Sequence, residues 1–292
     1  MPETVFDTIR IVLVEPAGAL NVGSIARVMK NMGLHHLVLV NPHCDPVGAE
    51  ARQMAVHADD VLATASIVAT LPDALRGCQR AIATTARARS VATLLEHPRA
   101  ALPWLIEASP PNMGAIVFGP EDRGLSNAEL DHAQRFVGIP SNPAYPSLNL
   151  AQAVAICCYE LYQLVWDRSR ADRGIGGQDD MGMSPAGGSS PQSASPIAPI
   201  AASEPPFAAA PIEVLEAYYQ HLEDVLLKIG YLYPHTAFSR MQKFRRLFNR
   251  ALPSDEEVAM LRGILSQVDW ATKKLNERKT DVTDDTIAAS DS

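Results

Sequence analysis

The chain has 292 residues, which is enough for one large domain or two smaller ones, each able to bury a hydrophobic core. Its 25 lysines and arginines stand against 33 aspartates and glutamates, and the formal net charge of −8 argues against binding to nucleic acid through bulk charge. The four cysteines form no C-x-x-C pair and no ladder with histidines, so we expect neither a disulfide framework nor a zinc site. Without a signal-peptide pattern or an apolar run of about 20 residues, the sequence predicts a cytoplasmic protein that does not span a membrane.

Short β-branched runs alternate with helical patterns through the first 170 residues. The runs that predict strands are residues 9–14, 36–40, 66–69, 80–84, 115–118 and 135–139. The patterns that predict helices between them are residues 21–33, 71–78, 99–108 and 126–133. The alternation predicts an α/β domain with a mainly parallel sheet and helices on both faces. Ligands of such sheets bind beyond the carboxyl ends of the strands, so the loops that follow the strands are the candidate site.

The segment after the first strand is EPAGALNVGSIARVMKNMG, in which we expect Asn21 to cap a helix and Gly33 to end it. Gly23 and Arg27 lie four residues apart on one face of this helix. The glycine would allow a backbone or a ligand to come close, and the guanidinium could bind a phosphate through two parallel hydrogen bonds. An ordinary solvated arginine is the alternative interpretation.

The loop after residues 115–118 has the sequence GPEDRGLSNAEL. Gly119 and Gly124 permit tight turns, and Ser126 and Glu129 form a capping box for the next helix. Backbone amides in this loop could hold part of a cofactor, although a tight connection between strand and helix needs the same residues. The chain has no P-loop and no G-x-G-x-x-G after its first strand, which argues against nucleotide triphosphate hydrolysis and ordinary dinucleotide binding.

The loop after residues 135–139 begins PSNPAYPSLNL, and its prolines enforce an extended conformation. These prolines are Pro140, Pro143 and Pro146. We expect Ser147 at the N-cap of the next helix, and capping alone would explain both Ser147 and Asn149. Cys157 and Cys158 on that helix are expected to fill the core rather than to act as nucleophiles, because no histidine flanks them.

Residues 171–211 are dominated by Gly, Ser, Ala and Pro and predict a flexible linker between a domain at 1–170 and a helical domain at 212–280. Residues 281–292 are expected to form a disordered acidic tail. Amphipathic patterns at 211–228 and 257–270 predict two helices of the second domain. The segment 236–252 contains five cations and no acid, which favours contact with phosphates over a plain solvated face. These cations are Arg240, Lys243, Arg245, Arg246 and Arg250.

Taken together, the three loops resemble the three motifs of the SPOUT-class RNA 2′-O-ribose methyltransferases. The matching segments are NVGSIAR at 21–27, FGPEDRGL at 118–125 and IPSNPAYPSLNL at 139–150. The resemblance covers the whole first domain. LEAYYQHLEDVLLKIGY and MQKFRRLFNRALPSDEEVAMLRGIL resemble the helical extension of the TrmJ branch of this class, whose members methylate the ribose of nucleotide 32 in the tRNA anticodon loop.

The resemblance implies a sheet whose C-terminal part is tied into a trefoil knot, in which the methyl donor S-adenosylmethionine is bound. The residues that match the family's donor pocket are Thr84, Thr85, Ala86, Gly119, Ile139, Pro146, Ser147 and Leu148. Arg27 and Ser147 match the catalytic pair, with Asn21 and Glu121 in support. The resemblance further implies tRNA as the partner, bound through the five cations of 236–252, and a homodimer formed through the knotted domain. We expect no metal site, no membrane and no DNA as a partner.

Methyl transfer to a ribose oxygen needs the 2′-oxygen in line with the methyl group, and holding the two reactants in place can supply ~7 to 11 kcal/mol. The three loops present neither a histidine nor a lone carboxylate as an obvious base. Because a guanidinium stays protonated, we interpret Arg27 as a clamp on the RNA phosphate and the 2′-oxygen, with the proton passing to phosphate or water. The alternatives are a related enzyme for ribosomal RNA or the wobble ribose, a catalytically idle RNA-binding protein, and a small-molecule α/β enzyme.

Overall fold

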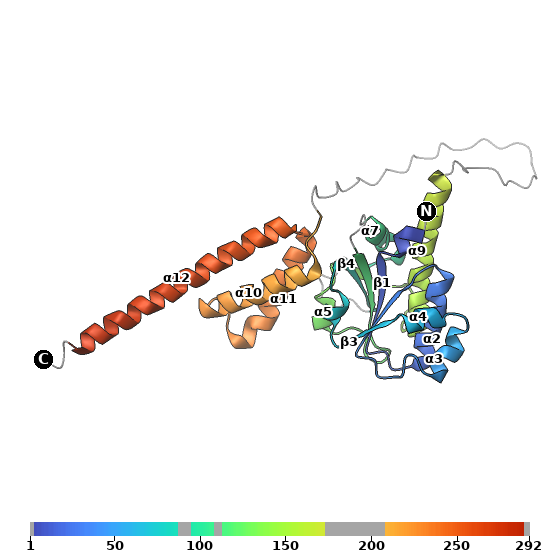
Figure 1. Cartoon of the computed structure of the whole chain (residues 1–292), viewed down its shortest axis with the longest axis horizontal. Coiled ribbons are helices and arrows are strands. Elements are labelled where there is room, and N and C mark those ends of the chain that lie inside the picture. The colour runs from blue at the N-terminus through green and yellow to red at the C-terminus, as the bar shows by residue number, and fades with distance from the viewer. Residues whose placement is uncertain (1–2, 87–94, 108–112, 173–207, 289–292) are drawn as a thin grey trace, which may run out of the picture.

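The computed structural model describes residues 3–86, 95–107, 113–172 and 208–288, with side chains described in 5–86, 95–107, 113–170 and 208–274. Most of the predicted linker at 171–211 therefore lies outside the described residues. Figure 1 shows a twisted sheet flanked by helices, followed by a purely helical C-terminal part from which α12 extends away. Among the described helices, none is long and apolar enough to cross a membrane.

Within the described residues, seven strands form one sheet in the order β3-β2-β1-β6-β4-β7-β5, and each neighbouring pair is parallel. The strands are β1 (Ile9–Val14), β2 (His36–Val40), β3 (Ser66–Val68), β4 (Cys78–Thr84), β5 (Leu95–Glu96), β6 (Met113–Phe118) and β7 (Arg135–Val137). All six predicted strands are confirmed, although β7 ends two residues early. The sequence did not predict β5, because two residues show no alternation.

The helices of the first domain differ from prediction mainly in length and number. They are α1 (Glu3–Phe6), α2 (Ala19–Asn31), α3 (Ala49–Ala55), α4 (Asp59–Ala63), α5 (Leu71–Ala74), α6 (Pro98–Ala101), α7 (Pro103–Ile106), α8 (Asn127–Leu130) and α9 (Leu150–Asp172). The helix predicted at 99–108 is two short helices. Leu102 keeps a helical conformation, but Pro103 has no N–H to continue the helical hydrogen bonds. The sequence missed α3 and α4, which are too short for a visible helical period.

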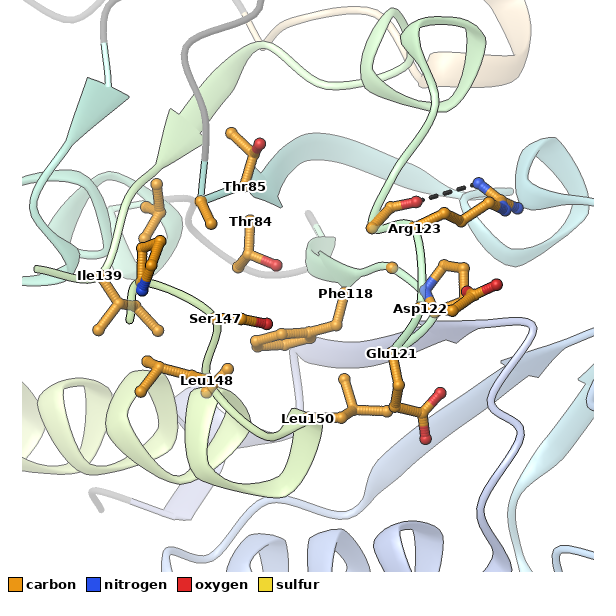
Figure 2. Close-up of a pocket in the computed structure, with 17 residues that line it drawn as sticks. Thr84, Thr85, Phe118, Glu121, Asp122, Arg123, Ile139, Ser147, Leu148 and Leu150 are labelled. Atoms are coloured by element: carbon orange, nitrogen blue, oxygen red, sulfur yellow. Dashed lines mark hydrogen bonds between the residues drawn. The ribbon is translucent and has the colours of Figure 1, made fainter. Parts of the chain in front are cut away.

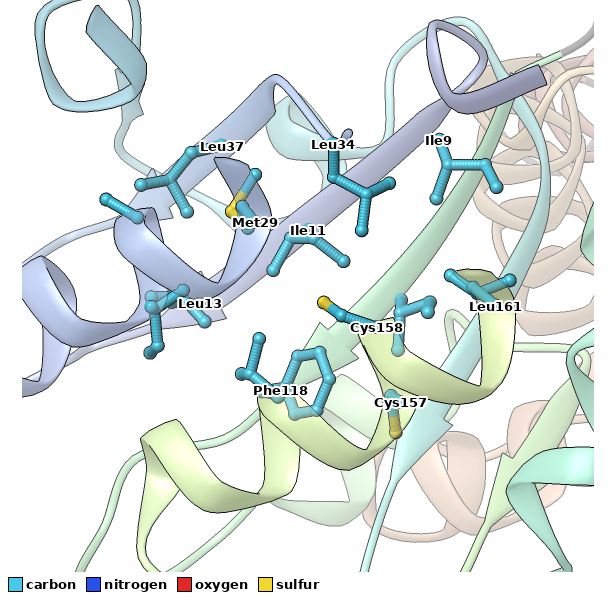
Figure 3. Close-up of a cluster of buried hydrophobic side chains, with 14 of the residues drawn as sticks. Ile9, Ile11, Leu13, Met29, Leu34, Leu37, Phe118, Cys157, Cys158 and Leu161 are labelled. Atoms are coloured by element: carbon cyan, nitrogen blue, oxygen red, sulfur yellow. The ribbon is translucent and has the colours of Figure 1, made fainter. Parts of the chain in front are cut away.

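Side chains of each strand alternate between two hydrophobic layers. Ile9, Ile11 and Leu13 of β1 face the layer formed with α2 and α9, as Figure 3 shows. Cys157 and Cys158 of α9 are fully buried in the same layer. Burial raises the pKa of the Cys157 thiol to about 12, which leaves it protonated and unreactive. The prediction that both cysteines fill the core is confirmed.

The other face of the sheet carries Val12 and Val14 and is covered by short elements. Helices α5 and α8 are single turns, and Leu125 and Ile212 complete the layer. Ile212 belongs to the C-terminal domain and is only 3% exposed. The helices on both faces that the sequence predicts are present, but one face is closed in part by the second domain.

The second domain is purely helical, as predicted. Its helices are α10 (Ile212–Lys228), α11 (Pro234–Ala251) and α12 (Asp255–Ala288). Leu215, Tyr218, Met241 and Val258 belong to its own buried core, which is separate from the two layers around the sheet. Helix α12 continues to Ala288, through most of the segment in which the sequence predicts an acidic disordered tail.

Polar contacts join the second domain to the first. Both carboxylate oxygens of Glu213 accept from the backbone N–H of Gly77, at 3.0 and 3.1 Å. Glu216 accepts from His132 Nδ1 at 3.0 Å and from both terminal nitrogens of Arg245. Asn249 of α11 donates to the carbonyl oxygen of Asp131 at 3.1 Å. The two domains are therefore docked through buried apolar contact and through charge-assisted hydrogen bonds.

The charge on Glu216 holds this contact together. Burial by itself would raise the pKa of the carboxyl, but hydrogen bonds from His132 and Arg245 outweigh burial and lower the pKa to about 2. A group whose pKa is lower in the folded than in the unfolded state contributes stability above its unfolded pKa. That contribution is lost as the pH falls from about 4.5 towards 2.

We therefore predict that Glu216→Gln lowers the free energy of unfolding at pH 7 by at least about 1.5 kcal/mol, the value of one charge-assisted hydrogen bond. The difference from wild type should shrink as the pH falls below about 4.5. Urea unfolding of the full chain between pH 7 and pH 3 measures both effects. Asp224→Asn, an exposed position on the same helix, is the control and should change little. A constant difference across this pH range would contradict the assignment.

Candidate functional site

The sheet order brings four loops to one edge of the sheet. Strands β1, β6, β4 and β7 are consecutive neighbours, and because all are parallel their carboxyl ends meet. A pocket of about 360 Å³ opens there, shown in Figure 2. It is lined by Thr84, Thr85, Ala86, Phe118, Gly119, Pro120, Glu121, Asp122, Arg123, Gly124, Val137, Ile139, Pro146, Ser147, Leu148, Leu150 and Ala153.

All eight residues that the motifs assign to a donor pocket line this one cavity. Sequence patterns had indicated the loops but not several wall residues, among them Phe118, Val137 and Leu150. These three are buried at strand or helix ends, where a pattern of burial cannot separate a core position from a pocket wall. The available signals were the place of Phe118 and Val137 at the carboxyl ends of strands and the place of Phe118 and Leu150 at the ends of the matching motif segments.

The loop at 119–125 folds back on itself. A Cβ atom on Gly119 would lie 2.4 Å from the backbone nitrogen of Leu125, and Gly124 has a left-handed φ of +65°. Only glycine fits the first position, and glycine is strongly favoured at the second. The predicted capping box of Ser126 and Glu129 is also confirmed.

Arg123 fixes this loop to its surroundings. Its guanidinium donates to Glu129 at 2.9 and 3.0 Å and to Glu15 at 2.7 Å. Glu15 follows β1 with a φ of 46°, a left-handed conformation that is unfavourable for a residue with a Cβ. Burial opposes ionisation of Glu129, but Arg123 and Ser126 outweigh it and lower its pKa. One cation thus ties the pocket loop after β6 to the segment that follows β1.

A chain of amide hydrogen bonds joins the three motif segments. Asn149 Nδ2 donates to Asn21 Oδ1 at 3.0 Å, and Asn21 Nδ2 donates to Glu121 Oε1 at 2.9 Å. The other oxygen of Glu121 accepts from the backbone of Ala17 at 3.2 Å. The expectation that Asn21 caps its helix is wrong, because α2 already begins at Ala19 and Gly18 occupies the N-cap. The Asn21 side chain instead bridges the first, second and third motifs.

Asn149, rather than Ser147, caps α9. Its Oδ1 accepts from the backbone N–H of Ala151 at 2.9 Å, one residue after the helix begins at Leu150. The predicted N-cap at Ser147 is therefore wrong by two residues. Ser147 is exposed, its side chain lies along the pocket in Figure 2, and it makes no hydrogen bond within the described part of the chain. Its hydroxyl is available to a ligand.

Gly23 and Arg27 have different surroundings, although both lie on α2. Gly23 is buried, and a Cβ there would lie 2.0 Å from the carbonyl oxygen of Ala51, so it serves the close packing of α2 on α3. Arg27 is exposed, has no hydrogen bond or ion pair to a described residue and does not line the pocket. The structure therefore does not bring Arg27 together with Ser147 in a single chain.

A second, shallower hollow lies beside the pocket. Asn21 lines it together with Leu20, Cys44 and Asp45, and the hydrogen bond from Asn21 to Glu121 connects it to the wall of the pocket. Burial is the main cause of a raised pKa of the Cys44 thiol, and Glu121 and Asp45 add to it. The thiol is therefore poorly suited as a nucleophile.

The five cations of segment 236–252 divide into two groups. Arg245 is 19% exposed and is committed to Glu216 in the domain contact. The other four, Arg240, Lys243, Arg246 and Arg250, are exposed on α11. Within the described residues these four form no ion pair within salt-bridge distance.

Two family models match the chain. The SpoU rRNA Methylase family model matches residues 8–159, and the model for the C-terminal domain of tRNA methyltransferase TrmJ matches residues 213–280. The protein of Pectobacterium atrosepticum named tRNA (cytidine/uridine-2′-O-)-methyltransferase TrmJ is 40% identical over 262 residues, which cover 90% of this chain and 97% of that protein. A protein of the same name from Sodalis glossinidius is 38% identical over 265 residues, covering 91% and 92%.

Solved structures show the same similarity. The crystal structure of TrmJ from Z. mobilis ZM4 superposes with a TM-score of 0.69 at 32% identity and covers 89% of this chain and 98% of that chain. A probable methyltransferase from Bordetella pertussis Tohama I gives a TM-score of 0.52 at 36% identity, covering 56% of this chain and 99% of that one.

The contrast between Asn149 and Ser147 gives a stability prediction. Asn149→Ala removes a helix cap and one bond of the amide chain and should lower the free energy of unfolding by about 1 kcal/mol or more. Ser147→Ala should change it by less than about 0.5 kcal/mol, because no described partner is lost. Urea unfolding of the two variants under one set of conditions provides the test. Equal losses, or a larger loss for Ser147→Ala, would contradict this assignment of the cap.

Proposed function

Since the chain belongs to the SpoU methylase family and carries the C-terminal domain of its TrmJ members, we propose that it methylates the ribose 2′-hydroxyl of nucleotide 32, cytidine or uridine, in the tRNA anticodon loop. S-adenosylmethionine is the methyl donor, and the enzyme is a tRNA (cytidine/uridine-2′-O-)-methyltransferase of class 2.1.1. The observation that carries this proposal is the pocket itself, because every residue that the motifs assign to donor binding lines it.

The residues of the pocket fit the donor. Its volume of about 360 Å³ lies within the range of small-molecule sites. Val137, Ile139 and Leu148 offer apolar contact for an adenine ring, and backbone groups after β4 and β6 offer hydrogen bonds. The carboxylates of Glu121 and Asp122 also line the pocket and would favour the donor's positive charges.

When bound, the donor supplies a methyl group activated by its positively charged sulfur. Ser147 hydrogen-bonds the target nucleotide or the donor through its unpartnered hydroxyl. The amide chain of Asn149, Asn21 and Glu121 holds the three motif loops in fixed relative positions, so that the 2′-oxygen can be aligned with the methyl group. We place the target nucleotide against the shallow hollow beside Asn21, which adjoins the donor pocket.

Arg27 binds the phosphate next to the target ribose and the 2′-oxygen. A guanidinium remains protonated in proteins, so Arg27 acts as a donor of hydrogen bonds rather than as a base. The proton that leaves the 2′-hydroxyl passes to phosphate or to water. Glu121 is a poor candidate for the base, because both of its carboxylate oxygens already accept hydrogen bonds.

The proposal includes a homodimer formed through the first domain, with the segment after β7 threaded as a trefoil knot. Arg27 does not line the pocket of its own chain, yet the motifs pair it with Ser147. In a dimer, Arg27 of one protomer would complete the pocket of its partner. The site is therefore shared between two chains. The four cysteines are unpaired, which fits the reducing cytoplasm as the place of action.

Four exposed cations on α11 are proposed to contact tRNA phosphates. These are Arg240, Lys243, Arg246 and Arg250. We leave Arg245 out of this surface, because its guanidinium is paired with Glu216 and mostly buried. The alternative functions are methylation of a different RNA and RNA binding without catalysis, and the product of the reaction distinguishes them.

The decisive experiment maps the product. The full chain is incubated with methyl-labelled S-adenosylmethionine and an unmodified tRNA transcript, and the modified ribose is located by mass spectrometry of nuclease fragments. We expect one methyl group at the ribose of nucleotide 32. A transcript with a 2′-deoxyribose at that position is the matched control and should accept none. Methylation elsewhere, or labelling of the deoxy control, would overturn the assignment, and absence of any product would favour the idle protein.

The shared site predicts complementation between two inactive variants. Arg27→Ala and Ser147→Ala should each lose most activity, whereas an equal mixture after subunit exchange should recover about one quarter of the wild-type rate. Half of the dimers are then mixed, and each mixed dimer holds one complete site of its two. Initial rates of tRNA methylation provide the measurement. A mixture no more active than its components would show that Arg27 serves its own chain. Arg27→Lys should restore little, because lysine cannot replace a bidentate clamp.

A further inference from the structure

The turn between α10 and α11 exposes aromatic side chains. Tyr231 is 52% exposed and Tyr233 is 55% exposed, with His235 exposed at the start of α11. The rings of Tyr233 and His235 are stacked, with centroids 6.0 Å apart and planes 24° apart. We call Tyr231, Tyr233 and His235 the aromatic platform. Apolar rings of this size cost free energy when they are left in water, so a gathering of them marks a binding surface.

The platform is held in a fixed conformation. Leu232, between the two tyrosines, is buried, and its backbone N–H donates to the carbonyl oxygen of Leu226 at 3.0 Å. Arg240 lies over the Tyr231 ring at 5.7 Å and donates to the Tyr231 carbonyl oxygen at 3.2 Å. The tyrosines therefore project outward from an anchored turn and would lose little conformational entropy on binding a ligand.

A cationic stripe adjoins the platform. Lys243, Arg246 and Arg250 are spaced three and four residues apart, which places them on one side of α11. Helix α11 contains no acidic residue, and this side of it is exposed. A row of cations beside exposed rings is complementary to a single strand of nucleic acid, whose phosphates and unstacked bases it can hold at once.

We propose that the aromatic platform stacks unpaired bases of the tRNA substrate while the cationic stripe binds the adjoining phosphates. This inference rests on the proposed function for the identity of the RNA. It adds a binding site for single-stranded RNA that depends on stacking against aromatic side chains rather than on charge. That site lies at the N-terminal end of α11.

The platform is remote from the donor pocket of the same chain. His235 and Asn249 are fourteen residues apart on α11, which corresponds to about 20 Å along the helix, and Asn249 is at the domain contact. That contact also uses Gly77, just before β4, whereas the pocket lies at the opposite, carboxyl end of the strand. The platform therefore holds a part of the RNA other than the reacting ribose, and its loss should affect binding rather than the chemical step.

The test is a double variant, Tyr231→Ala with Tyr233→Ala. The KM for tRNA should rise about 5- to 150-fold, the effect expected from lost stacking of one base, while kcat changes less than about twofold. Tyr231→Phe with Tyr233→Phe keeps both rings and should restore wild-type KM. Trp166→Ala is the matched control, because Trp166 is an exposed aromatic residue, 46% exposed, on α9 of the first domain.

Two further measurements separate stacking from charge. The salt dependence of tRNA binding should keep its wild-type slope in the double alanine variant, but become shallower by about 0.7 to 0.9 in Lys243→Ala. A tRNA transcript carrying 2-aminopurine at single unpaired positions should lose fluorescence on binding the wild-type and phenylalanine proteins, but not the double alanine variant. Unchanged KM and unchanged fluorescence response in the double alanine variant would overturn the proposal. The wild-type product map is independent of these results, so failure of the platform and failure of the proposed function can be told apart.

Discussion

The order of the parallel strands is the constraint on which the site depends. Because β6 pairs with β1 on one side and β4 on the other, and β7 pairs with β4, loops that lie more than a hundred residues apart in the chain end at one edge. No single loop makes a pocket. The hydrogen bond from Asn149 to Asn21 and the ion pair of Arg123 with Glu15 both span more than a hundred residues, and both need this order. The pocket is thus a product of topology that local polar contacts then make rigid.

The same sheet explains why the second domain docks where it does. The inner strands of this parallel sheet are apolar on both faces, so both faces must be covered. The long helices α2 and α9 cover one face, whereas α5 and α8 are too short to cover the other, and Ile212 of α10 completes it. That apolar contact excludes water and buries the carboxylate of Glu216, whose charge must then be paired. His132 and Arg245 are its hydrogen-bond partners. Burial and charge compensation therefore act together at the domain contact.

The sequence predicted six of the seven described strands, the parallel sheet, the helical second domain and the loops that form the pocket, because each of these has a local signature. What it missed depends on partners distant in the chain. Asn21 and Ser147 looked like helix caps, and only the structure shows that Asn21 bridges to Glu121 and that Asn149 is the cap. Gly23 was expected to let a backbone or a ligand come close, and only the structure shows which of the two it is, the backbone of Ala51. Arg245 could not be distinguished from its neighbours, because nothing local marks it as the partner of Glu216.

The net charge of −8 is compatible with an RNA substrate because the charges are distributed unevenly, with cations and no acidic residue on α11. Helix α11 presents three sides to three environments. Ala237, Met241 and Phe248 face the core of the second domain, Asn249 contacts the first domain, and Arg245 pairs with Glu216 beside that contact. The remaining side keeps its cations in water without acidic neighbours on the same helix. Glu216 forms an ion pair with one cation of the helix, Arg245. This ion pair fixes the orientation of α11 and so the direction in which the other four cations point. A negative protein can therefore carry a positive surface of defined orientation, and that orientation favours one folded RNA over polyanions in general.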